Sequence, residues 1–280
     1  MDITTIVGLV VALLLVGGSV VYADGFAGFE AFVSAEAFMI VIGGTICALL
    51  INYPLKTVIR VLTVLKKVFS EDKGEDTTKL VSTFVILSTK ARQRGFLALE
   101  EDVKKIEGDF LKRGVQLVID GQDQEFIRTM LETEISFIKE RHKVGEGMFN
   151  ALGTYSPALG IIGTVLGMIL MLRSIEDAAQ VPKKMALALA AAFYGLGSGY
   201  LLFLRIAGKL KRRSEEELQL KEIIIRGVLL LQSGASPSVV ESNLRAYLEP
   251  SQRIILAKNK AAGGSGAGTS QGAGPAAPGA

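Results

Sequence analysis

The sequence predicts an all-α, polytopic membrane protein with four transmembrane helices and a helical cytoplasmic domain. The chain has 280 residues, of which 49% are hydrophobic, and its mean hydropathy of +0.40 is typical of membrane proteins. Four apolar runs approach the length of about 20 residues that is needed to cross a bilayer. Almost no stretch alternates apolar and polar residues as a half-buried strand does.

The four apolar runs comprise residues 3–23, 38–53, 149–172 and 185–207. Only Asp2 precedes the first run as a charged residue, so we interpret this run as a retained span and not as a signal peptide. The second run is short, and tilt or local thinning of the bilayer would accommodate it.

These runs divide the chain into five regions. Residues 1–53 hold the first two spans with a short periplasmic loop, and 54–148 form a cytoplasmic helical domain. Residues 149–207 hold the last two spans, and 208–249 form a second cytoplasmic helical segment. Residues 250–280 form a tail rich in Gly and Ala, which cannot bury a core and is expected to be disordered.

The distribution of basic residues predicts the orientation of these regions. Residues 54–148 contain 17 Lys and Arg, and 11 more lie between Arg205, at the end of the fourth run, and the C-terminus. The loop between the first two runs contains none, and the link between the last two contains 3. Because basic residues accumulate on the cytoplasmic side, we expect both chain termini and both long regions in the cytoplasm.

Local signals predict where the cytoplasmic helices begin and end. Pro54 starts an amphipathic stretch, LKTVIRVLTVLKKVF, that is suited to the membrane surface, and EDKGED at 71–76 is expected to form a turn. Gly95 is expected to end the next helix, and a further amphipathic helix over 125–143 leads into the third span. Ser238 and Glu241 have the spacing of a capping box.

The spans carry no Asp, Glu, His or Lys in their middle. A charge there is costly and usually functional, so this chain alone has no evident ion carrier. The single cysteine, Cys47, cannot form a disulfide within the chain, and with one histidine no metal cluster is possible. We interpret Cys47 as a packing residue and His142 as a solvated surface residue. We expect no cofactor and no enzymatic activity.

Small residues recur on the last two spans at intervals that permit close helix approach. On the third span these are Gly160, Gly163 and Gly167, and on the fourth they are Ala188, Ala191, Ala192, Gly195 and Gly199. These faces either pack within one bundle or receive a helix from another protein that brings the missing ionisable group. Pro157 removes one backbone donor and can act as a hinge in the third span.

Several stretches resemble the A subunit of the bacterial flagellar stator, the MotA and PomA family, which is distantly related to TolQ and ExbB. They are IVIGGTICALLINYPLK, KARQRGFLALEED, SPALGIIGTVLGM, MALALAAAFYG and SPSVVESNLRAYL. The resemblance extends to about residue 249. It implies a homopentamer in the bacterial inner membrane around a dimer of a single-span B subunit, which carries the ion-binding aspartate and grips peptidoglycan. Ion flow would then drive rotation for motility and chemotaxis.

The resemblance also assigns residues to the ion pathway and to the contact with the B-subunit helix. Pro157 and Thr164 match the family residues next to the partner's aspartate, and Gly160, Ala192 and Gly195 lie beside them. Seven residues are nearly two helical turns, so Pro157 and Thr164 share a face. Sodium-driven members tend to have a threonine where this chain has Ala192, which favours protons as the translocated ion.

A second set of residues is implied to contact the rotor. Arg92 and Glu100 match the family's charged pair that engages the switch-complex protein of the C-ring, and Arg94 adds a charge beside them. Without the resemblance, these residues would be interpreted as a solvated surface pair. Arg205 stands where many members have proline, and its side chain can snorkel to lipid phosphate.

Two alternatives remain open at this stage. A TolQ/ExbB-like energiser of envelope processes would use the same kind of partner, although such proteins typically have three spans. A channel or transporter that needs no partner is disfavoured, because the spans carry no central charge and the chain shows no internal repeat.

Overall fold

The structure is a computed structural model that describes residues 3–68, 77–106, 108–248, 250 and 253. No described residue lies in a strand, which confirms the all-α class. The expected turn at 71–76 lies outside the described residues, as does the expected disordered tail apart from residues 250 and 253. The chain forms two compact units, Met1–Asp72 with Ser136–Glu216 and Lys73–Ile135 with Glu217–Ala280. We call them unit 1 and unit 2.

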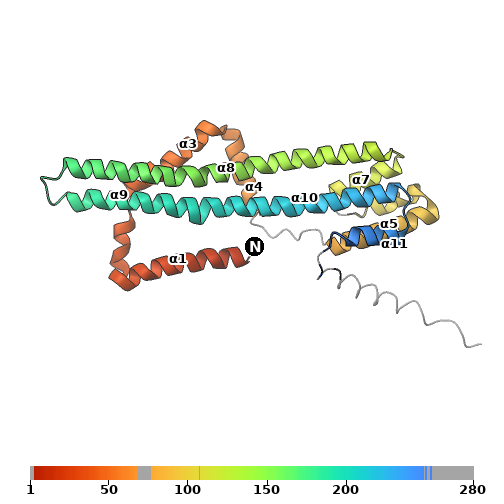
Figure 1. Cartoon of the computed structure of the whole chain (residues 1–280), viewed down its shortest axis with the longest axis horizontal. Coiled ribbons are helices and arrows are strands. Elements are labelled where there is room, and N and C mark those ends of the chain that lie inside the picture. The colour runs from red at the N-terminus through yellow and green to blue at the C-terminus, as the bar shows by residue number, and fades with distance from the viewer. Residues whose placement is uncertain (1–2, 69–76, 107, 249, 251–252, 254–280) are drawn as a thin grey trace, which may run out of the picture. The chain divides into compact units, whose positions relative to one another are not determined.

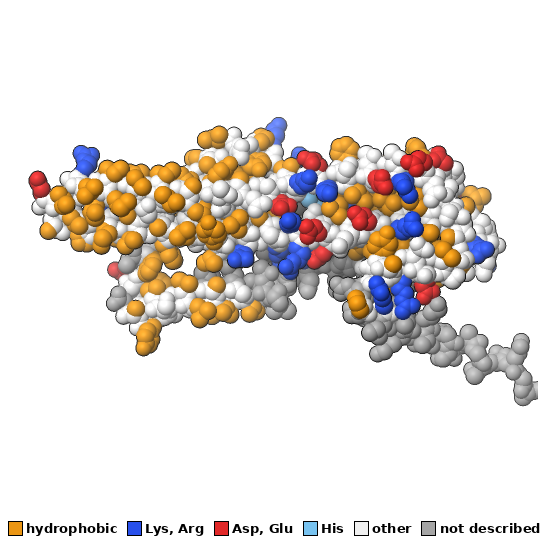
Figure 2. All heavy atoms as spheres, viewed as in Figure 1, with side chains coloured by type: hydrophobic (Ala, Val, Ile, Leu, Met, Phe, Trp, Pro, Cys, Tyr) orange, Lys and Arg blue, Asp and Glu red, His pale blue; other side chains and the backbone are white. Residues whose placement is uncertain are grey.

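Unit 1 contains the apolar helices (Figure 1). Its elements are α1 (Ile3–Asp24), the 3-10 helix η1 (Gly25–Phe32), α2 (Ala35–Phe38), the π-helical segment η2 (Met39–Gly43), α3 (Gly44–Asn52), α4 (Leu55–Val68), the C-terminal part of α8 (Gln124–Arg173), α9 (Val181–Leu196), the π-helical segment η4 (Gly197–Phe203) and the N-terminal part of α10 (Leu204–Gln232). Hydrophobic side chains cover α9 and the C-terminal half of α8 on the face drawn in Figure 2.

Three helical stretches are long and apolar enough to cross a membrane: Ala35–Asn52, a window in Gln124–Arg173 and a window in Val181–Gln232. The apolar part of α1, Val10–Ala23, is shorter. The structure thus supports three membrane-spanning helices among the described residues, and the predicted first span at residues 3–23 stays a prediction. The predicted helix over 125–143 and the third span form one continuous helix of 50 residues, because no capping residue or turn separates them.

Unit 2 is built from two separated chain segments around one hydrophobic core. Its elements are α5 (Thr77–Arg94), the 3-10 helix η3 (Phe96–Leu99), α6 (Glu100–Val103), α7 (Asp109–Ile119), the N-terminal part of α8, the C-terminal part of α10, and α11 (Pro237–Arg245). Phe84, Leu131 and Ile224 are among its fully buried side chains. α5 ends before Gly95, whose φ of 80° suits glycine, as the sequence predicts.

Three local expectations are wrong. The capping box at Ser238 and Glu241 does not start α11, because Pro237 occupies the first turn and Ser236 is the N-cap. His142 is half-buried, and its Nδ1 lies 2.9 Å from the Ser214 hydroxyl, since α8 and α10 run together beyond the membrane-spanning part. Cys47 is exposed in the single chain and does not fill a core.

Candidate functional site

The helices α8 and α9 pack against each other through their small residues. The facing pairs are Gly167 with Ala188, Gly163 with Ala191, and Gly160 with Gly195. Residue numbers rise along α8 while they fall along α9, so the helices are antiparallel, as Figure 1 shows. A Cβ added at Gly163 would lie 2.5 Å from the Cβ of Ala191, which leaves no space for a larger side chain.

This packing determines what two of the predicted site residues do within the chain. Gly160 and Gly195 are buried, and a Cβ added at Gly160 would lie 3.0 Å from the Cα of Gly195. The two backbones therefore touch directly, as in close helix pairs of membrane proteins. Both glycines lie in the line of contact between α8 and α9, which we call the seam. The remaining faces of the helix pair are the ones available to another helix.

The hydrogen-bond ladders of both helices are interrupted at the level of Pro157. Proline has no N–H to bond the carbonyl of Gly153, although α8 continues through it. The opposite helix forms the π-helical segment η4 at this level. A Cβ added at Gly199 in η4 would lie 2.7 Å from Pro157 Cδ and 3.1 Å from the Gly153 carbonyl oxygen. The proline ring thus packs directly on a glycine of the neighbouring helix.

A pair of serines joins the two helices beside the proline. Ser156 is fully buried, and its Oγ lies 2.5 Å from the Oγ of Ser198. Ser198 Oγ donates a hydrogen bond to the carbonyl oxygen of Tyr194 at 2.5 Å. Ser156 is therefore the donor in the serine pair, because Ser198 has only one hydroxyl proton. Sequence reasoning missed this pair, although Ser156 directly precedes Pro157.

The second apolar helix covers one side of the α8–α9 pair. A Cβ added at Gly44 of α3 would lie 3.1 Å from Leu159 of α8, and Val41 of η2 shares a core cluster with Ala190 of α9. Pro157 is two residues from Leu159, and Ala192 is two residues from Ala190. Two residues correspond to about 200° around a helix, so Pro157 and Ala192 face away from the second apolar helix.

Thr164 and Ala192 lie on the same side of the helix pair. Gly163 and Ala191 face each other across the seam, and Thr164 and Ala192 each follow by one residue. One residue is a rotation of about 100° in the same sense on each helix. Because the helices are antiparallel, these two rotations point to the same side. We call this side, which carries Pro157, Thr164 and Ala192, the open face.

The open face is apolar and exposed. Ile161 and Leu189 lie on it with exposed fractions of 65% and 63%. Thr164 is half-buried, and its Oγ1 donates a hydrogen bond to the carbonyl oxygen of Ile161 at 2.6 Å. The hydroxyl proton is used within the helix, so the oxygen lone pairs remain available to a proton donor or a cation. Among positions 157, 161, 164 and 168 of α8, Thr164 therefore supplies the one side-chain oxygen ligand, and none of the four is an acid.

The residues predicted to contact the rotor lie around the turn at Gly95 in unit 2, and we call this segment the charged turn. Arg92 and Arg94 are in the last turn of α5, and Glu100 is the first residue of α6. All three are exposed, and within the described part of the chain neither arginine is ion-paired with Glu100. The cations stand at a helix C-terminus and the acid at an N-terminus, where the helix dipoles favour these charges.

Two further contacts hold this turn. Lys90 Nζ lies 2.6 Å from Asp102 Oδ2, which links α5 to α6 across the turn. Leu99 is fully buried, whereas Leu97 between the charged residues is 74% exposed. Arg92 also lines a small cavity of about 100 Å³ with residues of α5, η3, α10 and the α10–α11 loop. The turn therefore presents both signs of charge and one apolar side chain on a firmly packed base.

The family of the chain is decided by comparison with known proteins. The model of the MotA/TolQ/ExbB proton channel family matches residues 102–223, and the model of the Motility protein A N-terminal region matches residues 6–95. Motility protein A of Bacillus subtilis (strain 168) is 34% identical over 92% of this chain and 95% of its own length. This chain belongs to the Motility protein A family.

Other members of the Motility protein A family agree with this assignment. Chemotaxis protein PomA of Vibrio alginolyticus is 33% identical over 91% of this chain and 98% of its own length. The solved structure of the flagellar MotAB stator complex from Bacillus subtilis has a TM-score of 0.82 and 33% identity, and covers 92% of this chain and 99% of that chain. The resemblance to the MotA and PomA family is thus confirmed.

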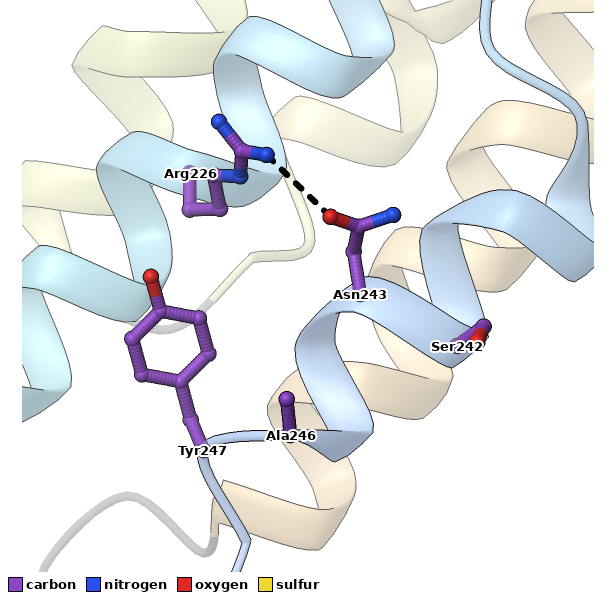
Figure 3. A pocket seen from close by; sticks show the side chains of 5 residues that line it. All are labelled: Arg226, Ser242, Asn243, Ala246 and Tyr247. Atoms are coloured by element: carbon purple, nitrogen blue, oxygen red, sulfur yellow. Dashed lines mark hydrogen bonds between the residues drawn. The ribbon is translucent and has the colours of Figure 1, made fainter.

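The Motility protein A fold of this chain has one further polar pocket that the sequence analysis did not anticipate. It lies in unit 2 between α10 and α11, measures about 420 Å³, and is lined by Arg226, Ser242, Asn243, Ala246 and Tyr247 (Figure 3). An Arg226 guanidinium N–H donates to Asn243 Oδ1 at 3.1 Å. The pocket shares no residue with the open face or with the charged turn at Gly95. Among the described residues, no group of three or more His, Cys, Asp or Glu side chains could hold a metal ion.

Proposed function

We propose that this protein is a stator subunit of the flagellar motor. With a single-span B subunit it forms an ion-conducting unit that couples ion flow to rotor torque. The observation that carries the proposal is the open face, an exposed and uncharged helix surface with Pro157 and Thr164, in a chain of the Motility protein A family. The solved MotAB stator complexes support a B subunit as the partner.

The open face needs a second chain in order to conduct. Its only polar side chain among positions 157, 161, 164 and 168 of α8 is Thr164, and a lone hydroxyl does not carry a proton at neutral pH. A partner helix with a carboxylate at the depth of Thr164 supplies the titratable group. Burying a carboxylate in a membrane costs free energy, and such groups are retained for function. A carboxylate at the depth of Thr164 therefore carries the translocated ion.

Replacing Thr164 tests this role. Thr164→Val keeps the shape of the side chain and removes the oxygen, and we expect it to lower torque while membrane insertion and partner binding persist. Thr164→Ser retains the oxygen and should keep more activity. Thr133→Val is the matched control, because this exposed hydroxyl also donates to its own helix, at the Thr129 carbonyl, but lies in unit 2. Wild-type torque in Thr164→Val would exclude a ligand role for this oxygen.

Protons are proposed as the translocated ion. Ala192 presents a methyl group on the open face, and a methyl group cannot coordinate a dehydrated sodium ion. Swimming speed should therefore fall with a protonophore and should not depend on sodium concentration. Speed that follows sodium would overturn this part of the proposal and leave the stator role intact.

The charged turn at Gly95 is proposed to contact the switch-complex protein of the rotor. Arg92, Arg94 and Glu100 are exposed and unpaired with one another, so their charges are available to a partner. Arg92→Glu should impair swimming and be partly restored by the opposite charge change on the rotor, whereas Lys112→Glu in the same unit should have little effect. Normal swimming with Arg92 and Glu100 both neutralised would contradict the contact.

The assembly follows from the same proposal. We propose a homopentamer in the bacterial inner membrane, with α1 as a fourth span, lipid on the outer apolar surfaces, and both termini in the cytoplasm, as the basic residues indicate.

The TolQ/ExbB-like alternative is not favoured, because relatives matching about nine-tenths of the chain are motility proteins. Loss of swimming after deletion of the gene, with envelope integrity unchanged, distinguishes the two.

A further inference from the structure

A row of positive charge begins on α10 where the apolar span ends. One face of α10 carries Arg205, Gly208 and Arg212, which are three and four residues apart and are all exposed. We call the two arginines the row. A Cβ added at Gly208 would meet no heavy atom within 4 Å, so the surface between the two arginines is open. Five basic residues lie between 205 and 213, and the first acidic residue after them is Glu215.

This row lies on the open-face side of the helix pair. Leu204 contacts α8, since a Cβ added at Gly153 would lie 2.6 Å from its Cδ2. Arg205 follows Leu204 by one residue, as Ala192 follows Ala191, and the rotation of about 100° has the same sense. The row therefore continues the open face past the level of Pro157.

The opposite side of α10 is occupied. Ile206 and Leu210 pack on a core cluster that contains Leu49 of α3 and Val58 of α4. Ala207 in the same cluster is buried, and it is about 200° around the helix from Arg205. The exposed arginines therefore point away from α4, on which Ile59 is exposed.

We propose that Arg205 and Arg212 bind an acidic segment of the B subunit, located directly cytoplasmic of its single span. This inference rests on the proposed function, which places the partner's helix on the open face. A helix on that face leaves the membrane beside Arg205, and the basic residues that usually flank a span there would repel the row. Carboxylates would instead bind the guanidinium groups in bidentate geometry, which fixes the register of the two chains.

Disulfide cross-linking in the complete complex tests the contact. Gly208→Cys in a Cys47→Ser background is paired with single cysteines placed in the partner segment next to its span. We expect a cross-linked heterodimer. Ile59→Cys is the matched exposed control, because it lies on α4, which packs against the occupied side of α10, and it should not link. Ala192→Cys, paired with cysteines in the partner span, reports on the proposed function by itself.

The outcomes separate the two proposals. Links at Ala192→Cys without links at Gly208→Cys overturn the charged contact and leave the stator role standing. Links at neither position contradict both. Homodimers through Gly208→Cys show that a second copy of this chain, and not the partner, covers the row, and they overturn the inference.

Charge reversal tests the chemistry of the contact. Arg205→Glu and Arg212→Glu should each reduce the heterodimer yield by about two- to fivefold, the range for an exposed charge pair, and high salt should do the same. Lysines in place of the partner's acidic residues should restore the yield with the reversed variants. Unchanged yield in the double reversal would refute an electrostatic contact.

Discussion

Replacing Gly195 by alanine is expected to force the α8–α9 pair apart. The new Cβ would lie 2.8 Å from the Cα of Gly160 and 2.8 Å from the carbonyl oxygen of Ser156. Both are backbone atoms and cannot rotate away. Carbon atoms pack best at about 3.5–4.0 Å, so the backbones must separate by roughly 0.7–1.2 Å.

The free-energy cost of separating the two backbones can be compared with the helix stability that alanine gains over glycine. Overpacking of this kind typically costs about 1–3 kcal/mol, whereas Gly→Ala in a helix gains up to about 1 kcal/mol. Gly197→Ala is the matched control, since a Cβ there meets no heavy atom within 4 Å. At about 2–4 °C per kcal/mol, Gly195→Ala should melt roughly 2–12 °C below Gly197→Ala.

The assay is thermal unfolding of the purified protein in detergent, followed by far-ultraviolet circular dichroism because the chain has no tryptophan. Equal melting temperatures for the two variants would refute the direct backbone contact. They would also return Gly195 to the residues available for a partner helix.

Three smaller changes test other contacts of the structure. Ser198→Ala removes the acceptor of the buried Ser156 hydroxyl and should lower the free energy of unfolding by about 1–3 kcal/mol, measured by thermal unfolding; no change would mean that the serine pair does not form. Tyr194→Phe removes the hydroxyl that donates to the Phe32 carbonyl, and should speed amide hydrogen exchange in η1 and α2. Lys90→Gln removes a partly exposed ion pair with α6 and should cost less than about 1 kcal/mol, so swimming should remain near normal if the pair only supports the turn.

Much of the fold follows from local sequence. The break at Gly95 is predictable because a helix that ends before a glycine in the left-handed region is a local event. The start of α11 is also local, but two signals compete there. The preference of proline for the first helical turn, at Pro237, prevails over the capping-box spacing of Ser238 and Glu241. Neither decision depends on residues far away in the chain.

The composition and periodicity of the sequence by themselves determine the helical class, the apolar spans, the absence of a charge in the middle of those spans and hence the need for a partner. Small residues at helical spacing also indicate a close approach, but they do not say which helix approaches. The tertiary structure decides that Gly160 meets Gly195, that α3 covers one side of the pair, and that Thr164 and Ala192 remain open on the other. The reason is that a helix period defines faces, whereas long-range packing selects which of those faces is covered.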